Sequence, residues 1–115
     1  MRRVLLLDDI RIQRFVMASL LSHLNCEVHS ATSGEEALAI AAEVKPDVVM
    51  LDIAMPEMDG YELAIRLRQE AGLTAAKLVA VSAWDCDVPK LAEAGIDQYI
   101  RKPINLHALK TALEH

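Results

Sequence analysis

Short apolar runs alternate with longer amphipathic segments along the whole chain of 115 residues. The short runs predict strands at residues 4–7, 26–30, 47–52, 77–82 and 98–101. Apolar residues at helical spacing predict helices at residues 11–24, 33–45, 60–71, 88–94 and 105–112. Consecutive strands that are joined by helices pair in parallel through right-handed crossovers. We therefore predict an α/β fold, in which a doubly wound five-stranded parallel sheet is flanked by five helices.

The expected helices begin and end at residues with capping preferences. Ser33 precedes two glutamates and is a good N-cap, and Asn105 is a good N-cap for the last helix. Gly72 and Gly95 are expected to end the third and fourth helices. The apolar residues expected on the buried faces of the first and third helices are Phe15, Leu20, Leu21, Leu24, Leu63, Ile65 and Leu67.

Composition and charge argue against several classes of protein. The net charge is −5 at pH 7 and no run of like charge is longer than a pair, so we expect no nucleic-acid-binding surface within this chain. Cys26 and Cys86 are widely separated, a spacing that suits neither a zinc site nor a disulfide framework and fits a reducing compartment. No run is long enough to cross a membrane and no signal-peptide pattern is present. We therefore expect a cytoplasmic protein without a membrane partner.

The length of the chain is that of one domain with its own core, so we expect residues 1–115 to form a single domain. The ending Leu113-Glu114-His115 is typical of the start of a vector-encoded polyhistidine tail. A native ending is the alternative, and both are left open. With a tag-derived ending, the last helix is expected to end near Ala112.

Polar side chains follow four of the five expected strands. Asp8 and Asp9 follow the first strand, Asp52 ends the third within MLDIAMPEMDG, Ser82 ends the fourth, and Lys102 follows the fifth. The carboxyl ends of parallel strands meet at one edge of the sheet, where function gathers in doubly wound folds. We therefore expect three carboxylates, one hydroxyl and one ammonium to lie close together.

Three neighbouring carboxylates repel one another and call for a cation among them. Mg²⁺ is the natural choice, because it prefers oxygen ligands and retains several waters. Calcium has the same ligand preference, but the sequence has no EF-hand loop. A carboxylate can accept a phosphoryl group as a nucleophile, while a metal, an ammonium and a hydroxyl neutralise the phosphoryl oxygens. Asp52, Lys102 and Ser82 supply the nucleophile, the ammonium and the hydroxyl.

The four segments LLLDD, LDIAMPEMDG, VSA and YIRKP, in this order and at about these separations, resemble the receiver domain of two-component response regulators. The resemblance covers essentially the whole chain, and the conjunction of the four is far more specific than any one of them. It implies a flavodoxin-like sheet of strand order 2-1-3-4-5. It also implies a signalling switch that accepts a phosphoryl group from a histidine kinase or phosphotransfer protein and later loses it by self-catalysed hydrolysis.

Position by position, the resemblance assigns the phosphorylation chemistry to five residues. Asp52 becomes the phosphoacceptor and Lys102 the phosphate-binding ammonium. Asp52, Asp9 and the backbone carbonyl of Ala54 become direct Mg²⁺ ligands, whereas Asp8 acts mostly through metal-bound water. A haloacid-dehalogenase-type phosphohydrolase is less consistent with the sequence, because it expects a second aspartate at the position of Ala54.

The resemblance also implies a conformational switch. Ser82 is the hydroxyl that turns toward the phosphate, and Tyr99 fills the space that Ser82 vacates. The bond between Lys102 and Pro103 is expected to be cis. The alternative function is an interaction module that keeps the fold and signals without phosphorylation. The presence of all five side chains that phosphorylation needs, those of Asp8, Asp9, Asp52, Ser82 and Lys102, weighs against it.

Two features depart from the common receiver pattern. The interval from Ser82 to Lys102 is shorter than usual, and the shortening falls within residues 85–94. This region belongs to the face through which receivers commonly dimerise, formed by the fourth helix, fifth strand and fifth helix, so a homodimer through that face is left open. Trp84 lies two residues after Ser82, where it is either a modulating cover of the phosphorylation site or an exposed partner contact.

Overall fold

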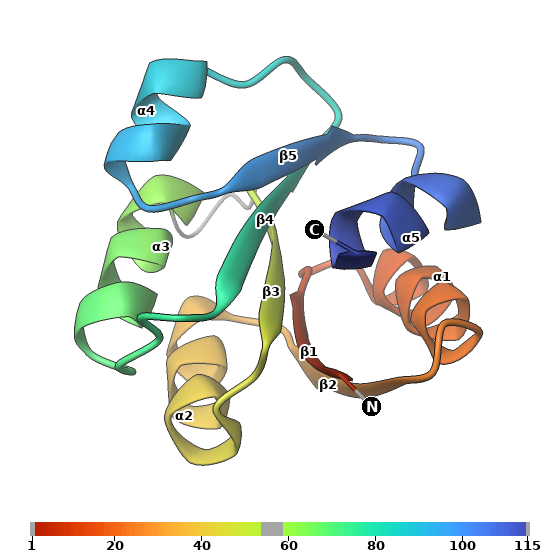
Figure 1. The fold of residues 1–115 in the computed structure, drawn as a ribbon, viewed down its shortest axis with the longest axis horizontal. Helices are drawn as coiled ribbons and strands as arrows, with labels where there is room; N and C mark the ends of the chain where they lie inside the picture. The colour runs from red at the N-terminus through yellow and green to blue at the C-terminus, as the bar shows by residue number, and fades with distance from the viewer. Residues whose placement is uncertain (1, 54–58, 115) are drawn as a thin grey trace.

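Five parallel strands form one sheet in the part of the chain that the computed structural model describes, residues 2–53 and 59–114 (Figure 1). The strands are β1 (Arg2–Leu7), β2 (Cys26–Ala31), β3 (Val48–Asp52), β4 (Lys77–Ser82) and β5 (Gln98–Arg101). The helices are α1 (Arg11–Ser22), α2 (Gly34–Val44), α3 (Gly60–Gln69), α4 (Val88–Glu93) and α5 (Leu106–Glu114). The order β2-β1-β3-β4-β5 confirms the predicted doubly wound fold.

The helices cover both faces of the sheet, and each face has its own hydrophobic core (Figure 1). On one face α2, α3 and α4 pack on the sheet, with residues such as Leu38, Leu63 and Leu91. On the other face α1 and α5 pack through residues that include Leu21 and Leu109. A parallel sheet covered on both sides needs apolar residues on both faces of its strands, which explains the continuous apolar runs of the sequence.

The central strand β3 is completely buried and carries Asp52 to the carboxyl edge of the sheet. Val49 and Leu51 face the core beneath α2 and α3, and Met50 faces the core beneath α1 and α5. In the register of the sheet, Leu51 lies beside Leu7, the last residue of β1. Asp52 therefore comes to the same edge as the residues that follow β1.

Both predicted N-cap residues accept a hydrogen bond from the first turn of their helix. Ser33 Oγ accepts a hydrogen bond of 3.2 Å from the backbone N–H of Glu36, and Asn105 Oδ1 accepts one of 2.8 Å from Ala108. These bonds satisfy backbone donors that the first helical turn leaves without partners.

Both predicted terminal glycines adopt the left-handed conformation that ends helices. Gly72 has φ of +69° and lies three residues beyond Gln69, the last residue of α3. In the turn after α4, the N–H of Ile96 donates to the carbonyl of Leu91 at 3.0 Å, as in a Schellman motif. Gly95 has φ of +82° just after α4. An L side chain is rarely accommodated at such angles, which accounts for glycine at both positions.

Two predictions of buried helical residues were wrong. Phe15 is 72% exposed, and the side chains of α1 that enter the core are Met17 and Leu21, with Leu20 only partly buried. Ile65 of α3 is 39% exposed, whereas Ala64 is buried. The predicted apolar stripe was displaced by one residue in α3 and by two in α1, and the larger side chain was wrongly preferred in both helices.

The ends of three helices differ from the sequence-based expectation, and α3 ends at Gln69 rather than at residue 71. α1 ends at Ser22 rather than at Leu24, because Asn25 has φ of +58° and turns the chain into β2. α5 continues to Glu114, and Leu113 is buried in the core on the α1 side, beyond the expected end near Ala112. The last turn of α5 thus contributes to packing.

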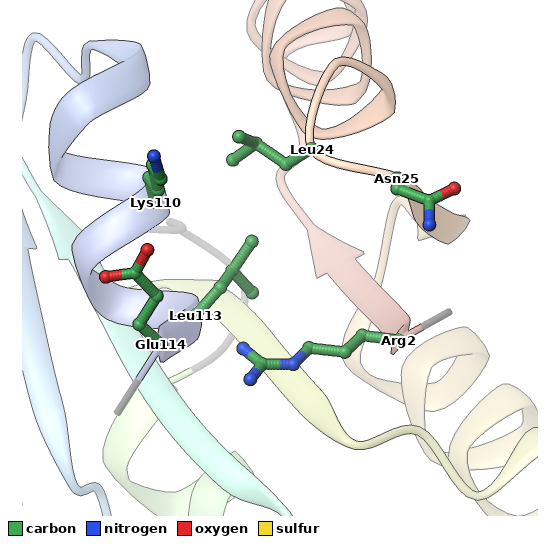
Figure 2. A pocket seen from close by; sticks show the side chains of 6 residues that line it. All are labelled: Arg2, Leu24, Asn25, Lys110, Leu113 and Glu114. Atoms are coloured by element: carbon green, nitrogen blue, oxygen red, sulfur yellow. The ribbon is translucent and has the colours of Figure 1, made fainter.

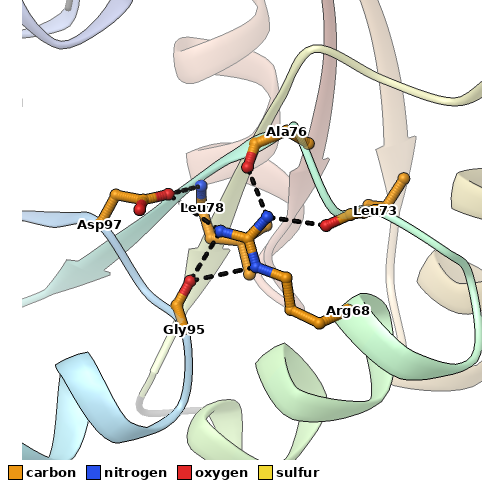
Figure 3. Close-up of polar contacts among 6 residues, drawn as sticks. All are labelled: Arg68, Leu73, Ala76, Leu78, Gly95 and Asp97. Atoms are coloured by element: carbon orange, nitrogen blue, oxygen red, sulfur yellow. Dashed lines mark hydrogen bonds and ion pairs between the residues drawn. The ribbon is translucent and has the colours of Figure 1, made fainter.

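Arg68 of α3 joins the loop before β4 to the turn after α4 (Figure 3). Its guanidinium donates to the carbonyls of Leu73 and Ala76 at 2.7 and 2.6 Å and to that of Gly95 at 2.8 Å. It also lies 3.0 Å from Asp97 Oδ2, the atom that accepts a 2.9 Å hydrogen bond from the N–H of Leu78. One side chain therefore links α3 to the beginning of β4 and to the turn before β5.

Candidate functional site

Three carboxylates meet at the carboxyl edge of the sheet. Oxygens of Asp8, Asp9 and Asp52 all lie within 4.8 Å of one another. Asp8 and Asp52 are each only 6% exposed, whereas Asp9 is exposed. The neighbouring strands β1 and β3 cause this meeting, because Asp8 follows the first and Asp52 ends the second. The structure thus brings together the three aspartates that the sequence singled out.

Lys102 places a positive charge against this cluster. Its Nζ donates a hydrogen bond of 3.1 Å to Asp52 Oδ2 and lies 3.7 Å from Asp8 Oδ2. The backbone N–H of Lys102 bonds to the carbonyl of Ser82 at 2.8 Å, and the bond between Lys102 and Pro103 is cis, as expected. The ammonium offsets part of the repulsion among the carboxylates, which a buried site otherwise could not tolerate.

The burial of Asp8 raises its pKa above the ordinary value near 3.8. A hydrogen bond from the N–H of Ile10 at 2.9 Å and the positive charge of Lys102 lower this pKa, whereas the charges of Asp52 and Asp9 raise it. Burial has the largest effect, and the net direction is upward. The folded protein therefore holds the ionised form of Asp8 at some cost in free energy, which a cation near the cluster can offset.

Because folding raises the pKa of Asp8, the folded state binds a proton at this carboxyl more tightly than the unfolded state does. The contribution of Asp8 to stability is therefore most favourable at low pH and declines as pH rises through the interval above the ordinary value of 3.8. We expect Asp8→Asn to gain stability relative to wild type as pH rises above the ordinary pKa of 3.8 in chelator, as measured by urea unfolding. Asp59→Asn, which keeps the N-cap of α3, is the control; an Asp8→Asn difference that is flat with pH contradicts the prediction.

The donor set of the cluster fits Mg²⁺. Three carboxylates offer hard oxygen atoms within reach of one another, and two of these groups are buried, where uncompensated negative charge is costly. Asp8, Asp9 and Asp52 are the residues that can hold the ion. The backbone carbonyl of Ala54, the other ligand expected from the resemblance, lies outside the residues that the structure describes.

Ser82 and Tyr99 lie on neighbouring strands next to this edge. Ser82, the last residue of β4, is 3% exposed, and its Oγ accepts a hydrogen bond of 3.0 Å from the N–H of Trp84. Tyr99 lies beside Ala80 in the register of β4 and β5 and is half-buried against the core beneath α3 and α4. Both predicted switch residues are thus close to the edge that carries the acidic cluster.

Trp84 is 70% exposed, so the core does not hold its ring. Its backbone bonds to Ser82 in the loop between β4 and α4, which places the residue beside the site. The α4 helix that follows has only six residues, in agreement with the shortened interval seen in the sequence.

Gln13 is a site residue that the sequence reasoning missed. Its Oε1 accepts a hydrogen bond of 2.7 Å from Lys102 Nζ, a shorter contact than the one between Lys102 and Asp52. Gln13 lies in the first turn of α1, which begins shortly after Asp9 at the carboxyl edge of β1. A polar residue in the first turn after a strand-end acidic pair was the signal that could have identified it.

A groove of about 520 Å³ opens beside the acidic cluster. Ile12, Gln13 and Val16 of α1 form one wall, and Lys102 and Pro103 form part of the other. Ile12 and Val16 are 73% and 52% exposed, so the groove continues onto an apolar surface of α1. Lys102 is therefore reachable from this side of the molecule.

Figure 2 shows a second cleft, of about 320 Å³, at the opposite edge of the sheet. Arg2 at the start of β1 lies there opposite Lys110, Leu113 and Glu114 of α5. Since the three aspartates lie at the carboxyl edge, this cleft is separate from the candidate site.

Among residues 2–53 and 59–114, no helix has the length and apolar character needed to cross a membrane.

Comparisons with known proteins agree with this geometry. The family model described as the response regulator receiver domain matches residues 4–114. The chain is 36% identical to the sensor histidine kinase RcsC of Salmonella typhi over 96% of its own length and 12% of that protein. It is 30% identical to protein PilG of Pseudomonas aeruginosa over 97% of its own length and 84% of that protein. The chain thus spans most of one relative and a small part of the other.

Solved structures show the same arrangement of elements. The chemotaxis protein CheY4 of Vibrio cholerae is 27% identical and superimposes with a TM-score of 0.93, covering 99% of this chain and 97% of that one. A CheY-like receiver domain from Methylobacillus flagellatus is also 27% identical, with a TM-score of 0.91 and the same coverage.

Proposed function

Since the chain belongs to the family of response regulator receiver domains of two-component signalling, we propose that it is a phosphorylation-controlled switch whose phosphoacceptor is Asp52. The observation that carries this proposal is the surroundings of the Asp52 carboxylate. Asp52 lies 3.1 Å from the Lys102 ammonium and within 4.8 Å of two further carboxylates, on a buried strand that fixes its position. This is the set of groups that phosphoryl transfer to a carboxylate requires.

In the transfer step, an oxygen of the ionised Asp52 forms a bond to the phosphorus of the donor while the bond from phosphorus to the donor breaks. With acetyl phosphate, the electron pair of the broken bond leaves with acetate. With a phosphohistidine donor, it leaves with the imidazole nitrogen, which then takes up a proton. Lys102, already bonded to Asp52 Oδ2, is in place to donate to an oxygen of the arriving phosphoryl group.

Hydrolysis returns the switch to its resting state. A water oxygen forms a bond to phosphorus, the bond from phosphorus to the Asp52 oxygen breaks, and inorganic phosphate leaves while the water proton is lost. Asp52 is then a free carboxylate again and can accept another phosphoryl group. We expect this self-catalysed reaction to be slow, in keeping with a signalling switch.

Asp8, Asp9 and Asp52 hold Mg²⁺ in this proposal, with Asp8 acting mostly through water. When bound, Mg²⁺ supplies positive charge to the phosphoryl oxygens during transfer. The close approach of the three carboxylates supports this assignment, because it places one ammonium against three acidic groups. Burial, the main cause of the raised pKa of Asp8, makes the ionised form of this carboxyl costly, and a bound cation offsets that cost.

Ser82 and Tyr99 are the switch residues in this proposal. Ser82 is buried at the end of β4, and its hydroxyl turns toward the phosphoryl group when Asp52 is modified. Tyr99, half-buried on β5, then fills the space that Ser82 leaves. These movements shift the population toward a second arrangement of the surface formed by α4 and β5.

The partners expected for such a switch are a histidine kinase or a histidine phosphotransfer protein. The family supports this class of donor, and the identity of the output partner is left open. A homodimer through α4, β5 and α5 stays a prediction, and the short α4 makes it less favourable than in receivers with a longer helix.

The proposal is tested by incubating the protein with acetyl phosphate and Mg²⁺ and finding the modified residue by borohydride reduction and peptide mass spectrometry. We expect one phosphoryl group on the intact protein before reduction, and after reduction, which releases the phosphate, conversion of Asp52 to homoserine. Labelling that requires no divalent cation, or that occurs on another residue, contradicts the proposal.

Trp84 is expected to prolong the life of the phosphoryl group. Its backbone N–H bonds to Ser82 Oγ and its ring is exposed, and in this proposal the ring hinders a water approaching the phosphorus. We predict that Trp84→Ala loses its phosphoryl group about threefold faster than wild type, which corresponds to roughly 0.6 kcal/mol in the barrier. The measurement is the decay of the phosphorylated protein after the donor is removed.

Phe15→Ala is the matched control for this comparison. Phe15 is an exposed aromatic residue on α1, 72% exposed against 70% for Trp84. Its removal is expected to leave the decay rate unchanged. Equal lifetimes in wild type and Trp84→Ala, or a shorter lifetime in wild type, exclude the shielding role.

A further inference from the structure

The ammonium of Lys102 has two close hydrogen-bond acceptors in the described part of the chain, and the carboxylate of Asp52 is the more distant of them. Gln13 Oε1 lies 2.7 Å from Lys102 Nζ, against 3.1 Å for Asp52 Oδ2. Asp8 Oδ2 is farther away, at 3.7 Å. A lysine ammonium has three donors on a flexible chain, so its acceptors decide where it rests.

Gln13 is itself held in place by the acidic segment. The N–H of Ile10, just before α1, donates to Asp8 Oδ1 at 2.9 Å, and Arg14 Nη1 donates to the carbonyl of Asp8 at 2.8 Å. These two bonds fix the first turn of α1 against the end of β1. Gln13 lies in that turn and is half-buried, so its amide approaches Lys102 from a defined direction.

The chemistry of an amide suits this place better than that of a charged group. A carboxylate at this position adds a fourth negative charge to the cluster and competes with Asp52 for the ammonium. An alkyl side chain offers no acceptor, and Lys102 then has only carboxylates to bond. The amide oxygen of Gln13 accepts one proton of Lys102 without changing the net charge of the site.

We propose that Gln13 is a positioning residue. Its amide holds the Lys102 ammonium at the rim of the site, between the Asp52 carboxylate and the groove beside α1. Gln13 and Lys102 both line this groove, so the bond between them lies where a phosphoryl group arriving from the groove first meets positive charge. The expected effect on phosphorylation rests on the proposed function of Asp52. The position of Lys102 in the resting protein does not depend on that function.

The test compares Gln13→Met with Gln13→Glu. Methionine has nearly the shape of glutamine and lacks the amide acceptor, so we expect labelling of Asp52 by acetyl phosphate at saturating Mg²⁺ to slow about fivefold. Glutamate keeps an acceptor oxygen at the same reach but adds a negative charge that competes with Asp52 for the ammonium, so we expect Gln13→Glu to be labelled slowly as well, while its Lys102 ammonium stays hydrogen-bonded. Gln69→Met, the same change at an exposed helical position in α3, is expected to behave as wild type.

A second readout does not depend on phosphorylation. In the absence of Mg²⁺ and donor, the ¹⁵N–¹H signal of the Lys102 ammonium, assigned with Lys102→Arg, reports whether its protons are held in hydrogen bonds. We expect the signal to be observable in wild type and Gln69→Met and to broaden in Gln13→Met. Thermal unfolding of the three proteins shows that the change is local.

The outcomes separate this inference from the proposed function. If wild type is not labelled but the ammonium signal is lost in Gln13→Met, the function of Asp52 fails and the positioning role stands. If wild type is labelled and Gln13→Met is labelled equally fast with an unchanged signal, the positioning role is overturned and the function stands. An ammonium signal that broadens in Gln13→Glu as much as in Gln13→Met also overturns it, because the acceptor oxygen then does not matter.

Discussion

Asp52→Asn is expected to abolish phosphoryl labelling by acetyl phosphate in Mg²⁺. The asparagine amide is of the same size as the carboxylate, so the buried end of β3 is kept, but it supplies no anionic oxygen that can bond to phosphorus. It also removes one of the three oxygen donors that can hold Mg²⁺. The measurement is the mass of the intact protein after incubation with the donor, with the fold checked by circular dichroism.

Asp59→Asn is the matched control for this loss. Asp59 caps α3 by accepting a 2.8 Å hydrogen bond from the N–H of Tyr61, and asparagine is an equally good N-cap. We expect this variant to be labelled at the wild-type rate. Full labelling of Asp52→Asn shows that another residue is the phosphoacceptor and contradicts the proposed function.

A comparison of wild type with Asp52→Ala distinguishes a phosphorylation switch from a constitutive interaction module. For a switch, a downstream partner binds wild type differently with and without the donor, and the Asp52 variant does not respond. For a module that signals without phosphate, the partner binds wild type and Asp52→Ala equally in both conditions. The buried position of Asp52 beside Lys102 favours the switch, because a module has no need of an ion pair that is costly to bury.

Much of this fold follows from local patterns in the sequence. The strand Val48–Asp52 reads as a continuous apolar run because both faces of the sheet are covered. Ser33 marks the start of α2 through its side-chain hydroxyl, and Gly95 marks the end of α4 through its left-handed backbone. The meeting of Asp8 with Asp52 also followed, because parallel strands place their carboxyl ends at one edge.

Other features depended on the three-dimensional arrangement and were missed for that reason. The exposure of Phe15 depends on the rotation of α1 about its own axis, which a short apolar stripe does not determine. The contact between Gln13 and Lys102 joins residues far apart in the chain through one pair of side chains. Arg68 is similar, because its acceptors are backbone carbonyls that carry no sequence signal.

Arg68 links the loop before β4 to the turn before β5. Its guanidinium satisfies the carbonyls of Leu73, Ala76 and Gly95, and its side chain is only 21% exposed. Asp97, its ionic partner, also accepts the N–H of Leu78 and thereby ties the turn before β5 to β4. Loss of the guanidinium therefore leaves several partly buried acceptors without their donor (Figure 3).

We expect Arg68→Met to lower the free energy of unfolding by about 3 kcal/mol, measured by urea denaturation, because each unpaired buried acceptor costs roughly 1–3 kcal/mol. Arg68→Lys is expected to recover only part of this loss, since an ammonium cannot reach acceptors on separate loops as a planar guanidinium does. The effect is large for a domain of this size, whose total stability is of the order of 5–15 kcal/mol.

Arg66→Met is the matched control, two residues earlier in the same helix. Arg66 bonds to Glu70 at 2.6 Å and to Glu35 at 3.0 Å, but both glutamates are exposed, at 53% and 75%. Surface ion pairs of this kind contribute about 0–1 kcal/mol, so the control is expected to lose far less than Arg68→Met. Equal losses in the two variants show that helical charge, rather than the carbonyl contacts of Arg68, determines the effect. A larger loss at Arg68 with Asp52 labelling retained places its role in the fold and not in the phosphorylation chemistry.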